Sequence, residues 1–224
     1  MPYRTKITAF VAPMALFIAL LGLKSALGSV HGTFWLEHAE YWIFPVQTLA
    51  CGALVWRFWP AYELNRPRRL GFGVGIGILV FVLWISPQAI FGFPPRTDGF
   101  NPDAFIGQPG LYWVTVVFRF LRLVVVVPVV EEIFWRGFLL RYLINEKFDE
   151  VPFGTFSWLS FGIVTIAFAL SHSMPDWVAA VITGALYNWV AYRTRSLATC
   201  VVTHAVTNSL LGLWIMWTKQ WGFW

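Results

Sequence analysis

Apolar stretches of spanning length recur along this chain and constrain its fold more than any other feature. A helix needs about 17–25 mainly apolar residues to cross a bilayer, and several stretches reach that length. We interpret as spans Ile7–Leu23, Tyr41–Trp59, Leu70–Phe91, one or two elements within Leu111–Ile144, Ser157–Ser171, Pro175–Tyr192 and Leu197–Trp217. Hydrophobic residues make up 58% of the 224 residues, and charged residues make up 12%. A chain of this composition has far more apolar surface than one soluble core could bury. The sequence therefore predicts an all-α integral membrane protein with about seven to eight transmembrane helices.

The connections between these stretches indicate a membrane domain without a soluble partner domain. Aromatic residues cluster near the ends of the spans, as at Trp56 and Trp59, where amphipathic rings settle at the level of the lipid headgroups. The connecting segments hold turn residues, and the longest of them, Gly92–Gly110, is rich in Pro, Gly and Asp. No soluble domain fits between the spans.

Basic residues gather in alternate connections, and this pattern predicts the orientation. They are Arg4 and Lys6, then Arg57, Arg66, Arg68 and Arg69, then Arg141 and Lys147, then Arg193 and Arg195. Because cytoplasmic loops are enriched in Lys and Arg, we expect an integral protein of a bacterial inner (plasma) membrane with its N-terminus in the cytoplasm. The net charge of +5 then reflects topology and contact with the lipid bilayer. The sequence has no basic soluble face with interleaved aromatic residues, so it does not indicate a nucleic-acid partner.

The first apolar stretch also has features of a signal peptide. Basic residues precede Ile7–Leu23 and the small-residue stretch Ser25–Gly28 follows it. The apolar stretch is longer than the usual apolar region of a signal peptide, so we favour an uncleaved first helix.

Four glycines open the third span, at Gly71, Gly73, Gly75 and Gly77. They form two overlapping pairs spaced four residues apart, and such pairs of small residues let helix backbones approach closely. We expect these glycines to serve helix packing.

Three apolar stretches contain polar residues of a kind that is costly in hydrocarbon. The first holds Glu131, Glu132 and Arg136, the second His172, and the third His204 and Asn208. Such groups usually face one another or a water-filled cavity. Counted from the loops, His172 falls near the outer end of its span, whereas His204 lies about 10 Å from the inner end of its own. Helix tilt or shifted span limits would bring the two level, and the sequence then predicts one shared intramembrane polar site.

The adjacent carboxylates of the first stretch differ in their expected partners. On a helix they project about 100° apart, and only Glu132 stands four residues from Arg136, where the two can pair. This pairing leaves Glu131 as the less compensated carboxylate, suited to accept and return a proton. The alternative is a polar clamp between helices, which would not require a second glutamate in the hydrocarbon.

Each of the other two stretches is ambiguous when taken alone. A histidine near a helix end, such as His172, is often a satisfied interfacial residue. His204 and Asn208 share one helix face at four-residue spacing, and both side-chain types also hydrogen-bond between helices. Only the combination of the three stretches favours a catalytic site.

The ordered set of motifs resembles one known family. The motifs are Glu131-Glu132-x-x-x-Arg136, Phe168-x-x-x-His172 and His204-x-x-x-Asn208. Together they resemble the three motifs of the CAAX protease and bacteriocin-processing family, also called Abi, whose intramembrane proteases include prenyl-protein endopeptidases. The resemblance covers Leu111–Leu213 and implies an all-α fold around a polar cavity open to one aqueous side. We therefore divide one membrane domain into N-terminal helices of unassigned role, 1–110, and a catalytic helical region, 111–224.

The resemblance also implies roles for the motif residues. Glu131 would correspond to the glutamate that, with the histidine matched by His172, activates a water to attack the scissile peptide bond. Glu132 and Arg136 would shape and stabilise the site. The implied substrate is a membrane-anchored protein or peptide, lipidated or not.

His204 and Asn208 would, by the same resemblance, support the oxyanion or bind a ligand opposite the base. This role agrees with the chemistry, since a tetrahedral oxyanion needs donors held in a dry pocket. A transporter is a rival function, although the expected internal repeats or broken helix pairs are not evident. A non-catalytic scaffold or chaperone-like member of the family is a second rival.

We favour no cofactor, and the alternative is a divalent metal such as zinc. Its ligands would be His172, His204 and Glu131, which could supply three ligands with an open fourth position. No His-Glu-x-x-His helix is present, and we favour a metal-free mechanism based on glutamate.

Three residues near the first motif are harder to assign. Arg119 and Arg122 lie between apolar neighbours, and we interpret them as part of an interfacial amphipathic helix that leads into the span of Glu131. The alternative is contact with a substrate carboxylate, because arginine binds carboxylates bidentately. Trp135 is expected to face lipid.

Overall fold

The computed structural model describes residues 1–30, 32–94 and 99–224, and in this part of the chain all regular elements are helical. The main helices are α1 (Tyr3–Gly28), α3 (Glu40–Arg57), α4 (Leu70–Ala89), α5 (Pro109–Phe120), α6 (Val127–Glu132), α7 (Leu140–Tyr142), α8 (Trp158–Leu170), α9 (Trp177–Thr194) and α10 (Leu197–Thr218). A short helix, α2 (Phe34–Glu37), follows α1. The predicted all-α class is confirmed.

Four helical stretches within the described residues are long and apolar enough to cross a membrane. They are Tyr3–Gly28, Leu70–Ala89, Pro109–Tyr142 and Leu197–Thr218. The other three expected spans coincide with α3, α8 and α9. Helix α8 has only 13 residues, a length of about 20 Å at 1.5 Å per residue.

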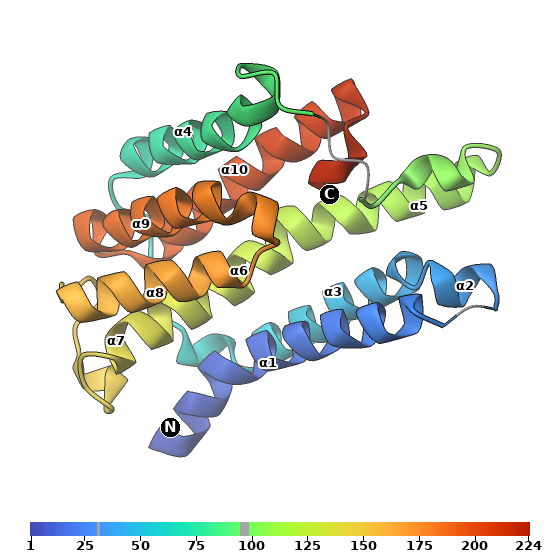
Figure 1. The fold of residues 1–224 in the computed structure, drawn as a ribbon. Helices are drawn as coiled ribbons and strands as arrows, with labels where there is room; N and C mark the ends of the chain where they lie inside the picture. The colour runs from blue at the N-terminus through green and yellow to red at the C-terminus, as the bar shows by residue number, and fades with distance from the viewer. Residues whose placement is uncertain (31, 95–98) are drawn as a thin grey trace.

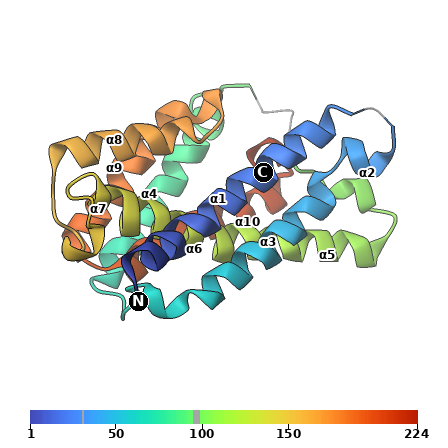
Figure 2. The ribbon, with the colours of Figure 1, turned by 90° about the horizontal axis from the view of Figure 1, so that it is seen from below.

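The long stretch Pro109–Tyr142 is one continuous helical run. It contains two π-helical segments, Leu121–Val126 and Ile133–Leu139, on either side of α6. In Figure 1 it passes between two groups of helices: α1 and α3 on one side, and α4, α8, α9 and α10 on the other. In the view from below, α1 overlaps α6 and α10 (Figure 2). The first motif therefore lies where the two groups meet.

The expected interfacial helix around Arg119 and Arg122 is wrong, because both side chains are buried inside the bundle. The guanidinium of Arg119 lies over the rings of Phe44 and Phe100, 4.9 and 4.8 Å from their centroids. Arg122 donates from Nε to Gln47 Oε1 at 2.6 Å. Aromatic faces and a carboxamide thus replace the water that an interfacial arginine would contact. Trp135 is also buried rather than facing lipid, with 5% of its surface exposed.

Helices α4 and α10 pack closely through one of the two glycine pairs. A Cβ added at Gly77 would come within 2.6 Å of the Thr203 carbonyl oxygen, and one at Gly73 within 2.7 Å of the Thr203 hydroxyl. A Cβ at Gly71 or Gly75 would meet no atom within 4 Å. The packing function expected of these glycines therefore applies to Gly73 and Gly77.

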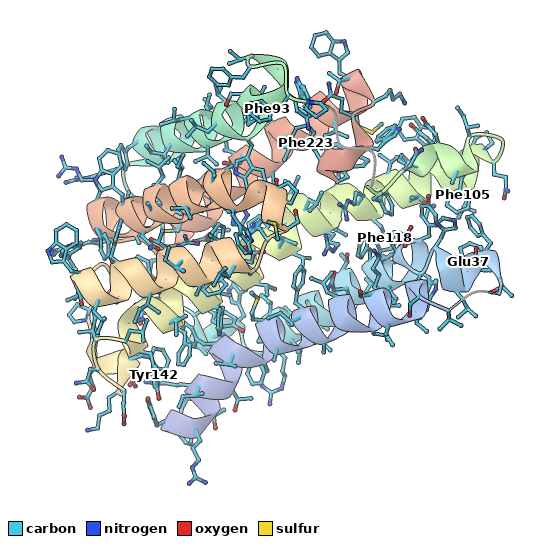
Figure 3. All side chains as sticks on the ribbon, viewed as in Figure 1. Glu37, Phe93, Phe105, Phe118, Tyr142 and Phe223 are labelled. Atoms are coloured by element: carbon cyan, nitrogen blue, oxygen red, sulfur yellow. The ribbon has the colours of Figure 1, made fainter. Side chains whose placement is uncertain are left out.

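The basic connections meet at one end of the bundle, which we call the basic end. It comprises the start of α1 and the α3–α4, α7–α8 and α9–α10 connections. The contacts across it are Lys6 Nζ with Asp149 Oδ2 at 2.7 Å, Arg141 Nη1 with Glu63 Oε1 at 3.1 Å, and the Arg68 amide with Thr199 Oγ1 at 2.9 Å. Figure 3 shows Tyr142 at this end, while Glu37 and Phe105 lie at the opposite end.

Candidate active site

Four of the predicted site residues line one cavity of about 740 Å³, which brings together Glu131, His172, His204 and Asn208. The cavity lies between the two helix groups, and α1 contributes an apolar wall of Met14, Phe17, Ile18 and Leu21. The predicted convergence of the two histidines and Glu131 on a shared cavity is therefore what the structure shows. The different heights expected for His172 and His204 do not keep them apart, because α8 is short and ends at Leu170.

Behind the cavity, Glu132 and Arg136 form the pair expected from their four-residue spacing. Arg136 Nη1 donates to Glu132 Oε1 at 3.0 Å, and both side chains are fully buried. The same Oε1 atom lies 3.0 Å from Nδ1 of His204. One carboxylate oxygen therefore joins the first motif to the third, a contact that spacing along the sequence could not indicate.

Helix α9 completes the surroundings of Arg136 with residues that the sequence analysis missed. Arg136 Nε donates to Asn188 Oδ1 at 3.0 Å, and Nη2 donates to the Gly184 carbonyl at 3.3 Å. Its guanidinium also lies over the rings of Phe168 and Tyr187, 5.0 and 5.4 Å from their centroids. The sequence did offer a signal for Asn188, because a carboxamide within an apolar helix is costly in hydrocarbon. The structure shows that its side chain is fully buried. The buried guanidinium is thus held by one charge, two polar acceptors and two aromatic faces.

His172 follows the end of α8 and is oriented by that helix. Its Nδ1 lies 2.8 Å from the Phe168 carbonyl oxygen, and a carbonyl can only accept, so Nδ1 carries the hydrogen. In the neutral ring, Nε2 is then the acceptor. The rings of Phe168 and Trp84 pack against the imidazole, with centroids 4.7 and 5.7 Å away. His172 thus presents a fixed ring with a free basic nitrogen to the site.

His204 is held in the same way from the opposite side. With Glu132 ionised by its pairing with Arg136, His204 Nδ1 donates to the carboxylate and Nε2 is the remaining ring nitrogen. The ring of Tyr187 packs against the imidazole at 5.1 Å, and the Tyr187 hydroxyl donates to Thr207 Oγ1 at 2.7 Å. Both histidines of the site therefore use Nδ1 for positioning.

Asn208 connects α10 to the long helix. Its Nδ2 donates to the Leu123 carbonyl at 2.7 Å, and Leu123 lies in the π-helical segment Leu121–Val126. A carboxamide nitrogen carries two hydrogens, so one N–H of Asn208 remains available beside the cavity. The residue combines a structural hydrogen bond with a free donor.

Glu131 has fewer partners than Glu132. Its Oε2 is buried and accepts no hydrogen bond from the residues that the structure describes. Glu132 Oε2 also accepts no hydrogen bond from the described residues, but Glu132 Oε1 accepts hydrogen bonds from both Arg136 and His204. Arg122, on the same helical run, lines the cavity together with Glu131. This agrees with the expectation that Glu131 is the less compensated carboxylate.

The alternative zinc ligands, Glu131, His172 and His204, all line the cavity. Within the described residues, no three His, Cys, Asp or Glu side chains are grouped so that they could hold a metal ion. His204 uses Nδ1 for Glu132, and a metal would bind its other ring nitrogen, Nε2. The metal dependence of the reaction itself stays a prediction.

Part of the chain matches the model of a known protein family. Residues 113–210 match the family model of the type II CAAX prenyl endopeptidases, Rce1-like. This segment is an Rce1-like domain. It begins in α5 and ends in α10, so the Rce1-like domain contains all three motifs and leaves residues 1–112 outside. The match covers less than half of the chain and supports, at the level of the family, a CAAX-type intramembrane protease.

The comparisons with curated proteins and with solved structures found no match. The apolar wall that α1 contributes to the cavity lies outside the Rce1-like domain. The sequence indicates no role for these N-terminal helices, because apolar residues in a span do not distinguish a cavity wall from a lipid-facing surface.

Proposed function

We propose that this protein is an endopeptidase that hydrolyses a peptide bond of a membrane-associated protein or peptide, with Glu131 and His172 activating the attacking water. The observation that carries the proposal is that both residues line one cavity while each retains an acceptor atom, Glu131 Oε2 and His172 Nε2. A water that attacks a carbonyl needs a base to take its proton. Few side chains in a membrane interior can accept one.

The first step would be addition of water to the scissile carbonyl. Glu131 takes a proton from the water as its oxygen bonds to the carbonyl carbon, and His172 Nε2 accepts a hydrogen bond from the same water. The ring of His172 is fixed by the Phe168 carbonyl, so little reorganisation is needed to position the water. The product is a tetrahedral intermediate with one anionic oxygen.

The anionic oxygen requires donors that are already in position. The second N–H of Asn208 is such a donor, because the first is used by the Leu123 carbonyl. His204 lines the same cavity, held by Glu132 and Arg136. We assign Asn208 to the oxyanion and the buried network behind it to positioning.

Collapse of the intermediate would complete the reaction. Glu131, protonated in the first step, returns its proton to the leaving amine as the carbon–nitrogen bond breaks. The base is thereby regenerated and no net proton remains on the protein. Each step uses side chains of this chain alone, in keeping with a mechanism that we propose to be metal-free.

The proposal can be tested in cells that lack the chain and are complemented with variants. Wild type should restore cleavage products that are detected as new protein termini in the membrane fraction by mass spectrometry. Glu131→Gln should not restore them, although it accumulates to the same level. Glu150→Gln is the matched control, because Glu150 is an exposed glutamate paired only with Lys147 among the contacts at the α7–α8 connection. Identical products from Glu131→Gln and wild type would refute the proposal.

A further inference from the structure

Many residues that line the cavity belong to segments at the end of the bundle opposite the basic end. The α8–α9 turn contributes Ser171, Ser173 and Asp176, in addition to His172. Trp84, near the end of α4, and residues 222–224, beyond the end of α10, line the same cavity. Figure 1 shows the α8–α9 turn and the C-terminus away from the ends of the helices that carry the basic connections.

A packed layer separates the cavity from the basic end. Its polar part consists of Glu132, Arg136 and Asn188, each with 0% of its surface exposed. Toward the basic end follow apolar side chains with at most 2% exposed, namely Phe10, Leu140, Phe148 and Leu197. Gly137 fits among them so closely that a Cβ there would come within 2.9 Å of the Phe10 ring. Access to Glu131 therefore comes from the other side of this layer.

The distribution of charge identifies which side that is. Ten of the 16 Lys and Arg residues belong to the basic end: Arg4, Lys6, Arg57, Arg66, Arg68, Arg69, Arg141, Lys147, Arg193 and Arg195. Among the described residues, the helix ends and connections of the opposite end carry Lys24 and Lys219 with Glu37, Glu40, Asp103 and Asp176. Lys and Arg are enriched in the cytoplasmic loops of membrane proteins, so the basic end faces the cytoplasm.

From these two relationships we propose that the cavity opens to the extracytoplasmic side. Its substrate class is then a translocated protein that is cut in the extracytoplasmic segment next to its membrane anchor, not a lipidated tail in the cytoplasm. This inference rests on the proposed function for the cleavage, but the side of the opening follows from geometry and charge alone. The apolar wall of α1, with Ile18 53% exposed, suits the apolar residues that flank such an anchor.

The side of the opening can be measured without any substrate. Single cysteines at Met174, in the α8–α9 turn with 73% of its surface exposed, and at Asn65, in the α3–α4 connection, would be treated with a membrane-impermeant maleimide. The native Cys51 and Cys200 are buried, with 0% and 1% exposed, and give little background. We expect Met174→Cys to react in intact cells and Asn65→Cys to react only after permeabilisation. The reverse pattern would overturn the proposal.

The substrate class is tested by where the new termini fall. In the complementation experiment with Glu131→Gln, cleavage sites in extracytoplasmic segments of anchored proteins support the proposal. Sites confined to cytoplasmic tails overturn it, even though they leave the proposed hydrolysis intact. If Glu131→Gln changes no termini, the proposed hydrolysis fails, and the maleimide pattern alone then decides the side of the opening.

Discussion

Glu132 and His204, which are 72 residues apart, meet at 3.0 Å through Oε1 and Nδ1 inside the bundle. Because Arg136 donates to the same oxygen, the carboxylate fixes both the arginine and the imidazole. A single buried glutamate thus sets the tautomer of a histidine on another helix. The two adjacent glutamates of the first motif consequently have different tasks, and substitution can separate them.

Glu131→Gln should remove activity while preserving the fold. The amide keeps the shape of the side chain but cannot take a proton, and loss of a general base lowers rates by about 10²–10⁴-fold. Glu131 Oε2 has no hydrogen-bond partner among the described residues, so thermal unfolding in mild detergent should be almost unchanged. The measurement is the appearance of cleavage products over time, with Glu150→Gln as control. An inactive variant that also unfolds early would contradict this division of tasks.

Glu132→Gln should lower stability as well as activity. The change leaves the guanidinium of Arg136 buried without its counter-ion, and breaking a buried ion pair costs about 3–5 kcal/mol. The free energy of unfolding in detergent should fall well below that of Glu131→Gln. Equal stability of the two variants would mean that the contacts of Arg136 with Asn188 and Gly184 suffice.

Gly77→Ala should destabilise the contact between α4 and α10. The added Cβ would lie 2.6 Å from the Thr203 carbonyl oxygen, and overpacking of this kind costs about 1–3 kcal/mol. Gly75→Ala is the matched control, since its Cβ would meet nothing within 4 Å and alanine is the better helix former. A lower unfolding temperature for Gly77→Ala alone is the expected result, whereas equal losses would point to flexibility of α4 instead of packing.

Removal of metals should leave cleavage intact. The described residues supply no group of three side chains that could hold a metal ion, and the proposed steps use Glu131, His172 and Asn208. After exhaustive chelation the purified protein should cut at its initial rate and contain no stoichiometric zinc. Loss of activity that zinc restores would contradict this prediction and would mean that Glu131, His172 and His204 come together around a zinc ion.

The helices could be predicted because their signal is local. A run of apolar residues between turn residues defines a span, and the expected limits of the last one, Leu197–Trp217, differ from α10 by one residue. The long helix was harder, because the charges of Arg119 and Arg122 suggested a surface. The rings that shield Arg119 come from α3, from the segment before α5 and from Trp224, and the local sequence around Arg119 does not indicate such neighbours.

The site could be predicted as a set of residues but not as a geometry. Polar groups in apolar helices indicated that they would converge, and the cavity contains Glu131, His172, His204 and Asn208. The sequence could not indicate that His204 would be paired with Glu132. It also gave no sign that α1 would form a wall, because that role depends on how the helices pack.

The π-helical segment Leu121–Val126 gives the long helix one residue more than a regular α-helix would need to reach Glu131. Each residue of an α-helix turns the chain by about 100°. Deletion of one residue within the segment would convert its wide turn to a regular one and leave Glu131 facing the cavity. Deletion of one residue between the segment and Glu131, in α6, would instead turn Glu131 away from the cavity, so the same loss of length is tolerated or inactivating according to its position.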